Sequence, residues 1–187
     1  VGYHRQEISL YRISKQLSTN VSSESRNIIY CPFEISIPKF LADDTPPRIL
    51  YNEMKRSNCD IISGTSNNGI SGNDCCLEGE ECIKATLQDN PFTYSAWAKL
   101  YSRKIIGDTR FCESFRVNED SFFVFEILCK KPFFKCINKS VYNYNQTPNS
   151  ISRSKFTEKY FDILNVSEKK YEIIEKNHPQ LLPLAEI

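Results

Sequence analysis

Apolar and polar residues alternate in three short stretches in the first third of the chain. The stretches are EISLYRIS at 7–14, FEISIPKFLADD at 33–44 and CDIISG at 59–64. A period of two residues is typical of half-buried strands. Pro38 interrupts the second stretch, which makes it an edge strand or a broken one. FFKCINKSVYNYNQ at 133–146 predicts a further strand.

Helical spacing of apolar residues predicts helices in the remaining structured segments. The predicted helices lie at 48–58, 79–90, 93–106, 118–131 and 154–178. Pro46 and Pro47 suit the first turn of the first of them. Acidic residues open the second and fourth helices, where they complement the positive end of the helix dipole. Pro179 stops the last helix.

The order strand, helix, strand predicts an α/β fold. The sequence of 187 residues shows no repeat and no linker, so we predict one domain over residues 1–187. Its 24 basic and 23 acidic residues are balanced, which argues against a nucleic-acid-binding protein. No apolar run approaches the ~20 residues of a transmembrane helix. No secretory signal is visible, and we predict a cytoplasmic protein.

Eight cysteines could serve as metal ligands or as buried apolar residues. They are Cys31, Cys59, Cys75, Cys76, Cys82, Cys112, Cys129 and Cys136. A structural zinc site needs closely spaced ligand pairs, yet the chain has no CxxC pair and only two histidines. We therefore interpret the cysteines as reduced thiols of a cytosolic protein.

Asp43 and Asp44 form the first candidate site, because they end a predicted strand. Paired carboxylates at a strand end can hold a hard divalent cation that also contacts phosphate. The alternative is a turn that caps the next helix, since DDTPP is also favourable turn sequence. Both interpretations stay open on the residues alone.

Glu119 and Asp120 form the second candidate site, directly before the apolar run SFFVFEIL. A carboxylate at a helix N-terminus is stabilised by the helix dipole, so the pair could be a simple acidic cap. It could also supply a general base that a rigid apolar helix holds in place. Asp44 and Asp120 lie far apart in the sequence, so only the fold decides whether they meet.

The segment SAWAKLY holds the third candidate pair, Trp97 and Lys99. Trp97 could pack in the core, and Lys99 could lie on a solvated face or contact the opposite acids. Alternatively, a base or sugar ring could lie against Trp97, with Lys99 near a phosphate or a carboxylate.

In this order, the motifs resemble the family 2 glycosyltransferases of the bacterial polysaccharide and capsule type. NPFTYSAWAKLYSRKII is similar to the family segment W-x-K-L-Y-x-R-x-x, and RF followed by RVNEDSFFVFEIL is similar to its Arg-Phe … Glu-Asp motif. INKSVYNYNQTPNSISRS is similar to its Tyr-x-Tyr … Ser-Ile-Ser/Thr region. NVSSESRN resembles the loop before the family's Asp-x-Asp strand, and KFLADD takes the place of that strand with Ala42 at the first aspartate.

The resemblance implies a GT-A fold, with a mixed, mostly parallel sheet flanked by helices. It implies sugar transfer from a nucleoside diphosphate sugar, such as a UDP-sugar, to a saccharide acceptor hydroxyl with inversion. Asp120 would be the catalytic base, and Glu119 would support it or contact the acceptor. Asp44, together with Asp43, would hold Mg²⁺ or Mn²⁺ on the diphosphate.

The same resemblance assigns the remaining substrate contacts. Trp97 and Lys99 would shape the acceptor side, and Arg26 and Asn27 would contribute to substrate binding. The N-terminal strands that hold the nucleotide in this family have no counterpart here, so we expect an N-terminally truncated domain. Peripheral membrane association stays open.

The alternative hypothesis is a catalytically inactive fragment or divergent relative. Such a protein would keep the fold and act as a binding or interaction module. The 10 tyrosines and 12 phenylalanines could form a docking surface for a protein partner.

Overall fold

The computed structural model describes residues 28–31, 45–66, 73–88, 90–143 and 158–185. The strands are β1 (Ile28–Cys31), β2 (Ile61–Ser66), β3 (Cys75–Glu78), β4 (Lys99–Ser102) and β5 (Phe133–Tyr142). The α-helices are α3 (Pro46–Ser57), α4 (Glu80–Leu87), α5 (Arg103–Ile106), α6 (Glu119–Leu128), α7 (Asp162–Asn177) and α8 (Leu182–Ala185). Short 3₁₀ turns lie at Pro91–Thr93, Glu158–Phe161 and Pro179–Leu181.

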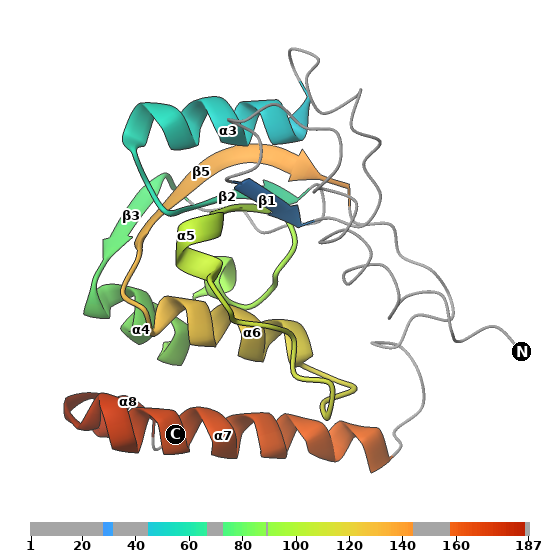
Figure 1. Cartoon of the computed structure of the whole chain (residues 1–187), viewed down its shortest axis with the longest axis vertical. Helices are drawn as coiled ribbons and strands as arrows, with labels where there is room; N and C mark the ends of the chain where they lie inside the picture. The colour runs from blue at the N-terminus through green and yellow to red at the C-terminus, as the bar shows by residue number, and fades with distance from the viewer. Residues whose placement is uncertain (1–27, 32–44, 67–72, 89, 144–157, 186–187) are drawn as a thin grey trace, which may run out of the picture.

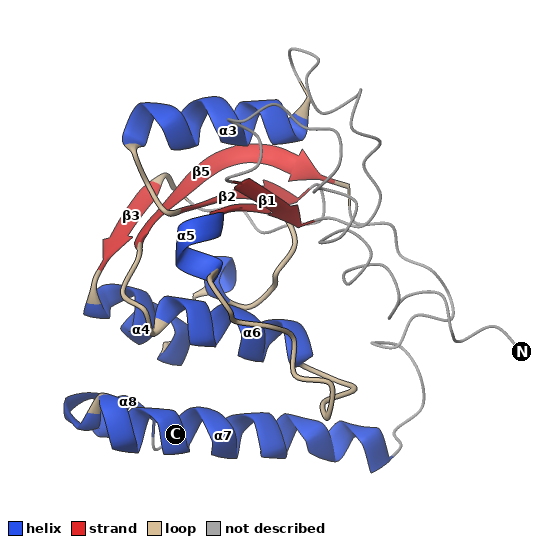
Figure 2. Ribbon diagram, in the orientation of Figure 1, coloured by secondary structure: helices blue, strands red, loops and turns tan. Residues whose placement is uncertain are grey.

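The described strands form one mixed sheet in the order β1-β4-β2-β5-β3, drawn in red in Figure 2. Only β2 and β5 pair in parallel, whereas the pairs β1 with β4, β2 with β4 and β3 with β5 are antiparallel. The predicted α/β fold with a mixed sheet is therefore confirmed, but the prediction of a mostly parallel sheet is wrong for the described strands. The direction of a strand depends on which end of the sheet its connection reaches, and hydrophobic periodicity is the same in both directions.

Helices cover both faces of this sheet (Figure 1). On one face, Leu50 and Met54 of α3 pack with Ile62, Leu100 and Ile137. On the other face, α6 packs its apolar side onto β2, β4 and β5. The residues in this second cluster include Ile61, Tyr101, Phe123, Val124, Ile127 and Phe134. These two clusters form the core and fix the positions of α3 and α6.

A further layer lies against the outer side of α6 and α4. Phe125 of α6 and Ile83 of α4 pack with Ile174 of α7 and with Leu181. Because α6 contacts the sheet on one side and α7 on the other, the helix is buried nearly all round. Its apolar run therefore has no solvent-facing side over most of its length.

The close approach of β2 and β5 requires a glycine at position 64. A Cβ built on Gly64 would lie 2.3 Å from Cγ2 of Val141 and 2.9 Å from the carbonyl oxygen of Lys139. Real side chains do not tolerate such distances, so any larger residue would push the strands apart. The register of β2 on β5 also shifts on either side of Thr65, which lets both strands bend at this point.

Six predicted elements are confirmed. The predictions at 48–58, 59–64, 79–90, 118–131, 133–146 and 154–178 correspond to α3, β2, α4, α6, β5 and α7. α3 begins at Pro46, as the two prolines indicate, and α4 carries Glu80 and Glu81 in its first turn. α7 ends at Asn177, just before Pro179. The predicted strands at 7–14 and 33–44 lie outside the described residues.

The predicted helix at 93–106 is wrong. Ala98 has a φ of 56°, which is left-handed backbone and ends any helix there. The next four residues form β4 between β1 and β2, and only Arg103–Ile106 is helical. β4 has only four residues, of which Lys99 and Ser102 are polar and Leu100 and Tyr101 apolar. Such a run does not distinguish a strand from a helix by periodicity. Residue patterns predicted no strand at Cys75–Glu78, where the structure has β3.

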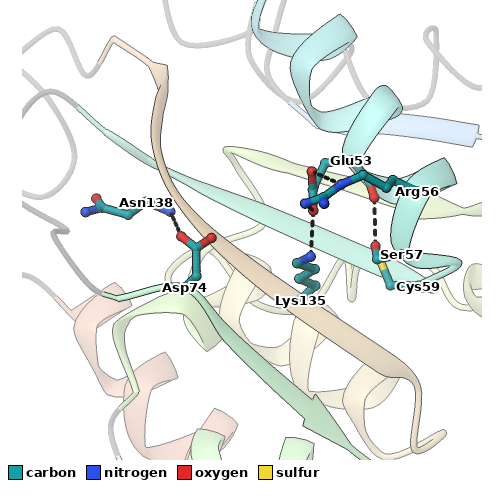
Figure 3. Close-up of polar contacts among 7 residues, drawn as sticks. All are labelled: Glu53, Arg56, Ser57, Cys59, Asp74, Lys135 and Asn138. Carbon is teal, nitrogen blue, oxygen red and sulfur yellow. Dashed lines mark hydrogen bonds and ion pairs between the residues drawn. The ribbon is translucent and has the colours of Figure 1, made fainter.

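One ion-pair network ties α3 to the sheet (Figure 3). Nζ of Lys135 on β5 lies 2.5 Å from Oε1 of Glu53, and Nη2 of Arg56 lies 2.7 Å from the same oxygen. The hydrogen bonds from Arg56 and Lys135 lower the pKa of Glu53 to about 2. The pair Glu53–Lys135 is largely shielded, since each side chain is only 15% exposed.

Within the described ranges, no helix combines the length and the apolar composition that crossing a membrane requires.

Glu53→Gln should lower the free energy of unfolding at neutral pH by about 1 kcal/mol, because it removes the negative partner of two cations. A carboxyl whose folded pKa is depressed stabilises the protein above its ordinary pKa, and this contribution is lost as pH falls through the folded value. The difference between wild type and variant should therefore shrink as pH falls from 4.5 towards about 2. Urea unfolding at several pH values measures it.

The matched control is Glu81→Gln on α4, where Glu81 pairs with Lys84 but its side chain is 61% exposed. Exposed pairs contribute little, so this control should change stability by less than ~0.5 kcal/mol. Equal effects of the two substitutions would contradict a role for the Glu53 network in holding α3 on the sheet.

Candidate functional site

Asp120 lies in the first turn of α6, at the N-terminal end of the helix. Its Oδ1 accepts a hydrogen bond of 2.8 Å from the backbone N–H of Ser121, and the backbone N–H of Ala96 also donates to this carboxyl. Ala96 belongs to the turn that leads into β4. The carboxylate therefore joins the helix N-terminus to the segment that carries Trp97 and Lys99.

Two contacts from α7 fix this end of α6. Nζ of Lys170 donates a 2.7 Å hydrogen bond to Oγ of Ser121. The backbone N–H of Arg116, before the helix, donates to Oδ2 of Asp162 at 2.8 Å. The outer helix thus holds the residues on both sides of Asp120, which keeps the carboxyl in place.

Burial controls the protonation of Asp120. Desolvation raises the pKa of this carboxyl above its ordinary value, because the charged form loses its hydration. Backbone N–H donors and the positive charge of Lys99 lower the pKa of Asp120 in part, but the net shift is upward. A carboxyl with a raised pKa is a better proton acceptor when it is ionised.

Lys99 is a buried cation on β4, with 1% of its surface exposed. Its Nζ donates a 3.4 Å hydrogen bond to the carbonyl oxygen of Trp97. It pairs in register with Ser63 of β2, which pairs with Cys136 of β5. Residues paired in this way point to one face of the sheet, and Cys136 packs in the cluster beneath α6. Lys99 therefore lies on the face that α6 covers.

The predicted partner Trp97 faces a different set of residues. Its indole is half-buried and stacks on the ring of Tyr142, with centroids 4.9 Å apart and planes at 22°. Both rings pack against the cluster on the α3 face. Trp97 thus contacts Lys99 through the Trp97 carbonyl oxygen, whereas the indole ring lies on Tyr142 at the end of β5.

Glu119 precedes Asp120 in the same helical turn and is half-buried. Successive helical residues do not face each other, so the two carboxyl groups point in different directions. The structure places Glu119 next to Asp120 in the first turn of α6.

The other predicted site residues, Arg26, Asn27, Asp43 and Asp44, lie outside the described residues. In the part of the chain that the structure describes, no group of three or more His, Cys, Asp and Glu side chains is arranged to hold a metal ion. The predicted cation site at Asp43 and Asp44 therefore stays a prediction.

Residue patterns did not reveal Ser63, Ala96 and Cys136 as neighbours of the site. Each comes from a separate segment, and the sheet register or the turn before β4 brings it to Lys99 or Asp120. No local motif marks them, because the sequence does not distinguish a small buried residue near a site from any other residue of the core.

No protein-family model matches the chain, and no curated protein matches it. The resemblance to glycosyltransferases therefore stays a prediction. A functional assignment rests on that resemblance together with the arrangement of Asp120, Lys99 and Trp97.

Asp120 should titrate above the ordinary pKa of an aspartate, because burial penalises its charged form. Lys99→Met should raise the pKa of Asp120 further, since it removes a positive charge while keeping the length of the side chain. Carboxyl carbon NMR during a pH titration measures both values.

Lys176→Met is the control, because Lys176 is exposed at the end of α7. It should leave the Asp120 titration unchanged. A normal or depressed Asp120 pKa in wild type, or one that does not respond to Lys99→Met, would rule out this electrostatic description.

Proposed function

We propose that this protein is a glycosyltransferase that moves a sugar from a nucleoside diphosphate sugar, such as a UDP-sugar, to an acceptor hydroxyl with inversion. One observation carries the proposal: the buried carboxyl of Asp120 lies at a rigid helix N-terminus with its pKa raised, within the electrostatic reach of Lys99. Asp120 also occupies the position of the catalytic base in the Glu-Asp motif that the sequence resembles.

Asp120 would act as the general base. It would accept the proton of the acceptor hydroxyl as that oxygen attacks the anomeric carbon of the donor sugar. The bond from the anomeric carbon to the diphosphate breaks on the opposite side, and a single displacement of this kind inverts the configuration. Lys99 favours the ionised form of Asp120, which the base requires before it takes the proton.

The helix behind Asp120 supports this role. The residues that follow, Ser121 to Phe125, are all buried, and Lys170 bonds to Ser121 from α7. A base held by packing on several sides keeps its orientation toward the acceptor oxygen. This accounts for two acids placed directly before a strongly apolar run.

The donor side rests on the resemblance. Asp44 and Asp43 would hold Mg²⁺ or Mn²⁺, and Arg26 and Asn27 would contact the nucleotide sugar. When bound, such a cation neutralises the charge that develops on the diphosphate leaving group. Trp97 would line the acceptor side, with Glu119 as a further acceptor contact, whereas the buried Lys99 would act through Asp120. We extend the proposal to a GT-A arrangement of the sheet and to a cytoplasmic location.

UDP should change the fluorescence of Trp97 in a saturable, Mn²⁺-dependent titration. Trp97 is the only tryptophan of the chain and is half-buried on Tyr142, so it reports on one place. Asp44→Ala should weaken the binding by at least ~tenfold, because it removes the proposed metal ligand.

The matched control is Asp108→Asn, an exposed aspartate after α5, which should leave UDP binding unchanged. Unchanged metal dependence in Asp44→Ala would remove Asp44 as the ligand. A folded chain that binds no UDP would favour the alternative, a catalytically inactive relative that acts as a binding module.

Asp120→Asn should lower the rate of sugar transfer by about 10²–10⁴-fold while the fold stays intact, because an amide does not accept the acceptor proton. A transfer assay with a UDP-sugar and a saccharide acceptor measures the rate, and circular dichroism checks the fold. Glu113→Gln, at an exposed position before α6, is the control and should keep full activity. Turnover near wild type in Asp120→Asn would exclude Asp120 as the base.

A further inference from the structure

Two cysteines from different strands face each other at the edge of the sheet. Cys75 of β3 pairs directly with Cys136 of β5 in the antiparallel ladder, and both side chains pack in the cluster beneath α6. The side chain and the backbone of Cys136 lower the pKa of the Cys75 thiol. The sheet register thus sets these two cysteines opposite each other although they lie far apart in the sequence.

The two thiols differ in exposure and in proton affinity. Cys75 is half-buried and can be reached by a small reagent, whereas Cys136 is 0% exposed. The donors from Cys136 lower the pKa of Cys75 to about 7, while the hydrogen bond to Cys75 and burial raise the pKa of Cys136. The lowered pKa favours the thiolate form of Cys75, and the raised pKa keeps the proton on Cys136.

Two other cysteines, the buried Cys82 and the half-buried Cys129, have the opposite character. Burial raises the pKa of Cys82 and of Cys129 to about 12, so both stay protonated and unreactive. Asp74, next to Cys75, is a nearby negative charge that raises the pKa of Cys75, and Lys99 is a nearby positive charge on the Cys136 side. Even with Asp74 present, the net shift of the Cys75 pKa is downward.

The strand geometry permits a bond between the two sulfurs. Opposed residues of an antiparallel pair have Cα atoms roughly 4.5–5.5 Å apart, within the roughly 4.4–6.8 Å that a disulfide spans. β3 has four residues and lies at the edge of the described sheet, paired only with β5 there. Oδ1 of Asp74 accepts a 2.7 Å hydrogen bond from the backbone N–H of Asn138, which holds this register (Figure 3).

We propose that Cys75 and Cys136 form a peroxide-reactive redox site, in which Cys75 is oxidised first and Cys136 resolves it to an intrachain disulfide. This site goes beyond sugar transfer and does not depend on it. The oxidant is hydrogen peroxide or another hydroperoxide.

The proposed reaction has two steps. The Cys75 thiolate attacks one peroxide oxygen, the O–O bond breaks, and Cys75 becomes a sulfenic acid while the departing hydroxide takes a proton to form water. The Cys136 sulfur then attacks the Cys75 sulfur, the S–O bond breaks, and the hydroxyl leaves with the Cys136 proton as a second water. Two thiols are oxidised to one disulfide, and one peroxide is reduced.

The first experiment treats the full chain with hydrogen peroxide, blocks the remaining thiols, and maps disulfides by peptide mass spectrometry. We expect a cross-link between Cys75 and Cys136 within one chain, and Cys75→Ser should abolish it. Cys76→Ser is the matched control: Cys76 is adjacent and exposed but points to the opposite face of β3, so the cross-link should persist.

The second experiment separates the order of the two steps. In Cys136→Ala, peroxide should leave Cys75 as a sulfenic acid that dimedone traps, and circular dichroism checks that the variant is folded. A test on the wild-type chain needs no substitution and so carries no folding defect. Iodoacetamide at neutral pH should modify Cys75 at least ~tenfold faster than Cys59, because burial raises the pKa of the Cys59 thiol.

Several results would overturn the proposal. They are a folded wild type that forms no Cys75–Cys136 disulfide under peroxide, a cross-link that runs only between two chains, and a cross-link that needs Cys76. Modification of Cys59 before Cys75 in wild type would do the same.

Discussion

The parallel pairing of β2 with β5 is the constraint on which the other parts of the structure depend. Its register sets Ile61 opposite Phe134 and Ser63 opposite Cys136, so alternate residues face α6 and the residues between them face α3. Gly64 allows the approach, since a Cβ there would overlap with Val141. The two apolar clusters on either face, and with them the positions of α3 and α6, follow from this pairing.

The candidate site depends indirectly on the pairing of β2 with β5, because β4 pairs with β2. β4 lies against β2 and sets Lys99 beside Ser63, on the face beneath α6. Removing an ammonium ion from water costs several kcal/mol unless polar groups compensate it. The Trp97 carbonyl oxygen and the field of the Asp120 carboxylate provide part of that compensation. Burial raises the pKa of Asp120 and the charge of Lys99 lowers it in part, so the packing of the core sets the protonation of the base that we propose.

Residue patterns predicted the elements whose signals are local. Pro46 and Pro47 marked the start of α3, the acids at 80 and 81 marked α4, and Pro179 marked the end of α7. The same reasoning failed for the segment at 93–106, where Trp97, Leu100 and Tyr101 have helical spacing. There Ala98 adopts a left-handed conformation, and Lys99–Ser102 form a strand because they pair with β1 on one side and β2 on the other. A strand of only four residues is too short for its pattern to distinguish it from a helix.

The amino-acid order alone was enough for the mixed α/β class, for most helix positions and for the choice of Asp120, Lys99 and Trp97 as candidates. Local propensity, helix caps and apolar period carry this information, because neighbours in the chain are neighbours in a helix or strand. The tertiary structure alone decided strand direction, the separation of the Trp97 ring from Lys99, and the pairing of Cys75 with Cys136 across β3 and β5. These depend on which distant segments pair across the sheet, and residue periodicity does not encode that register.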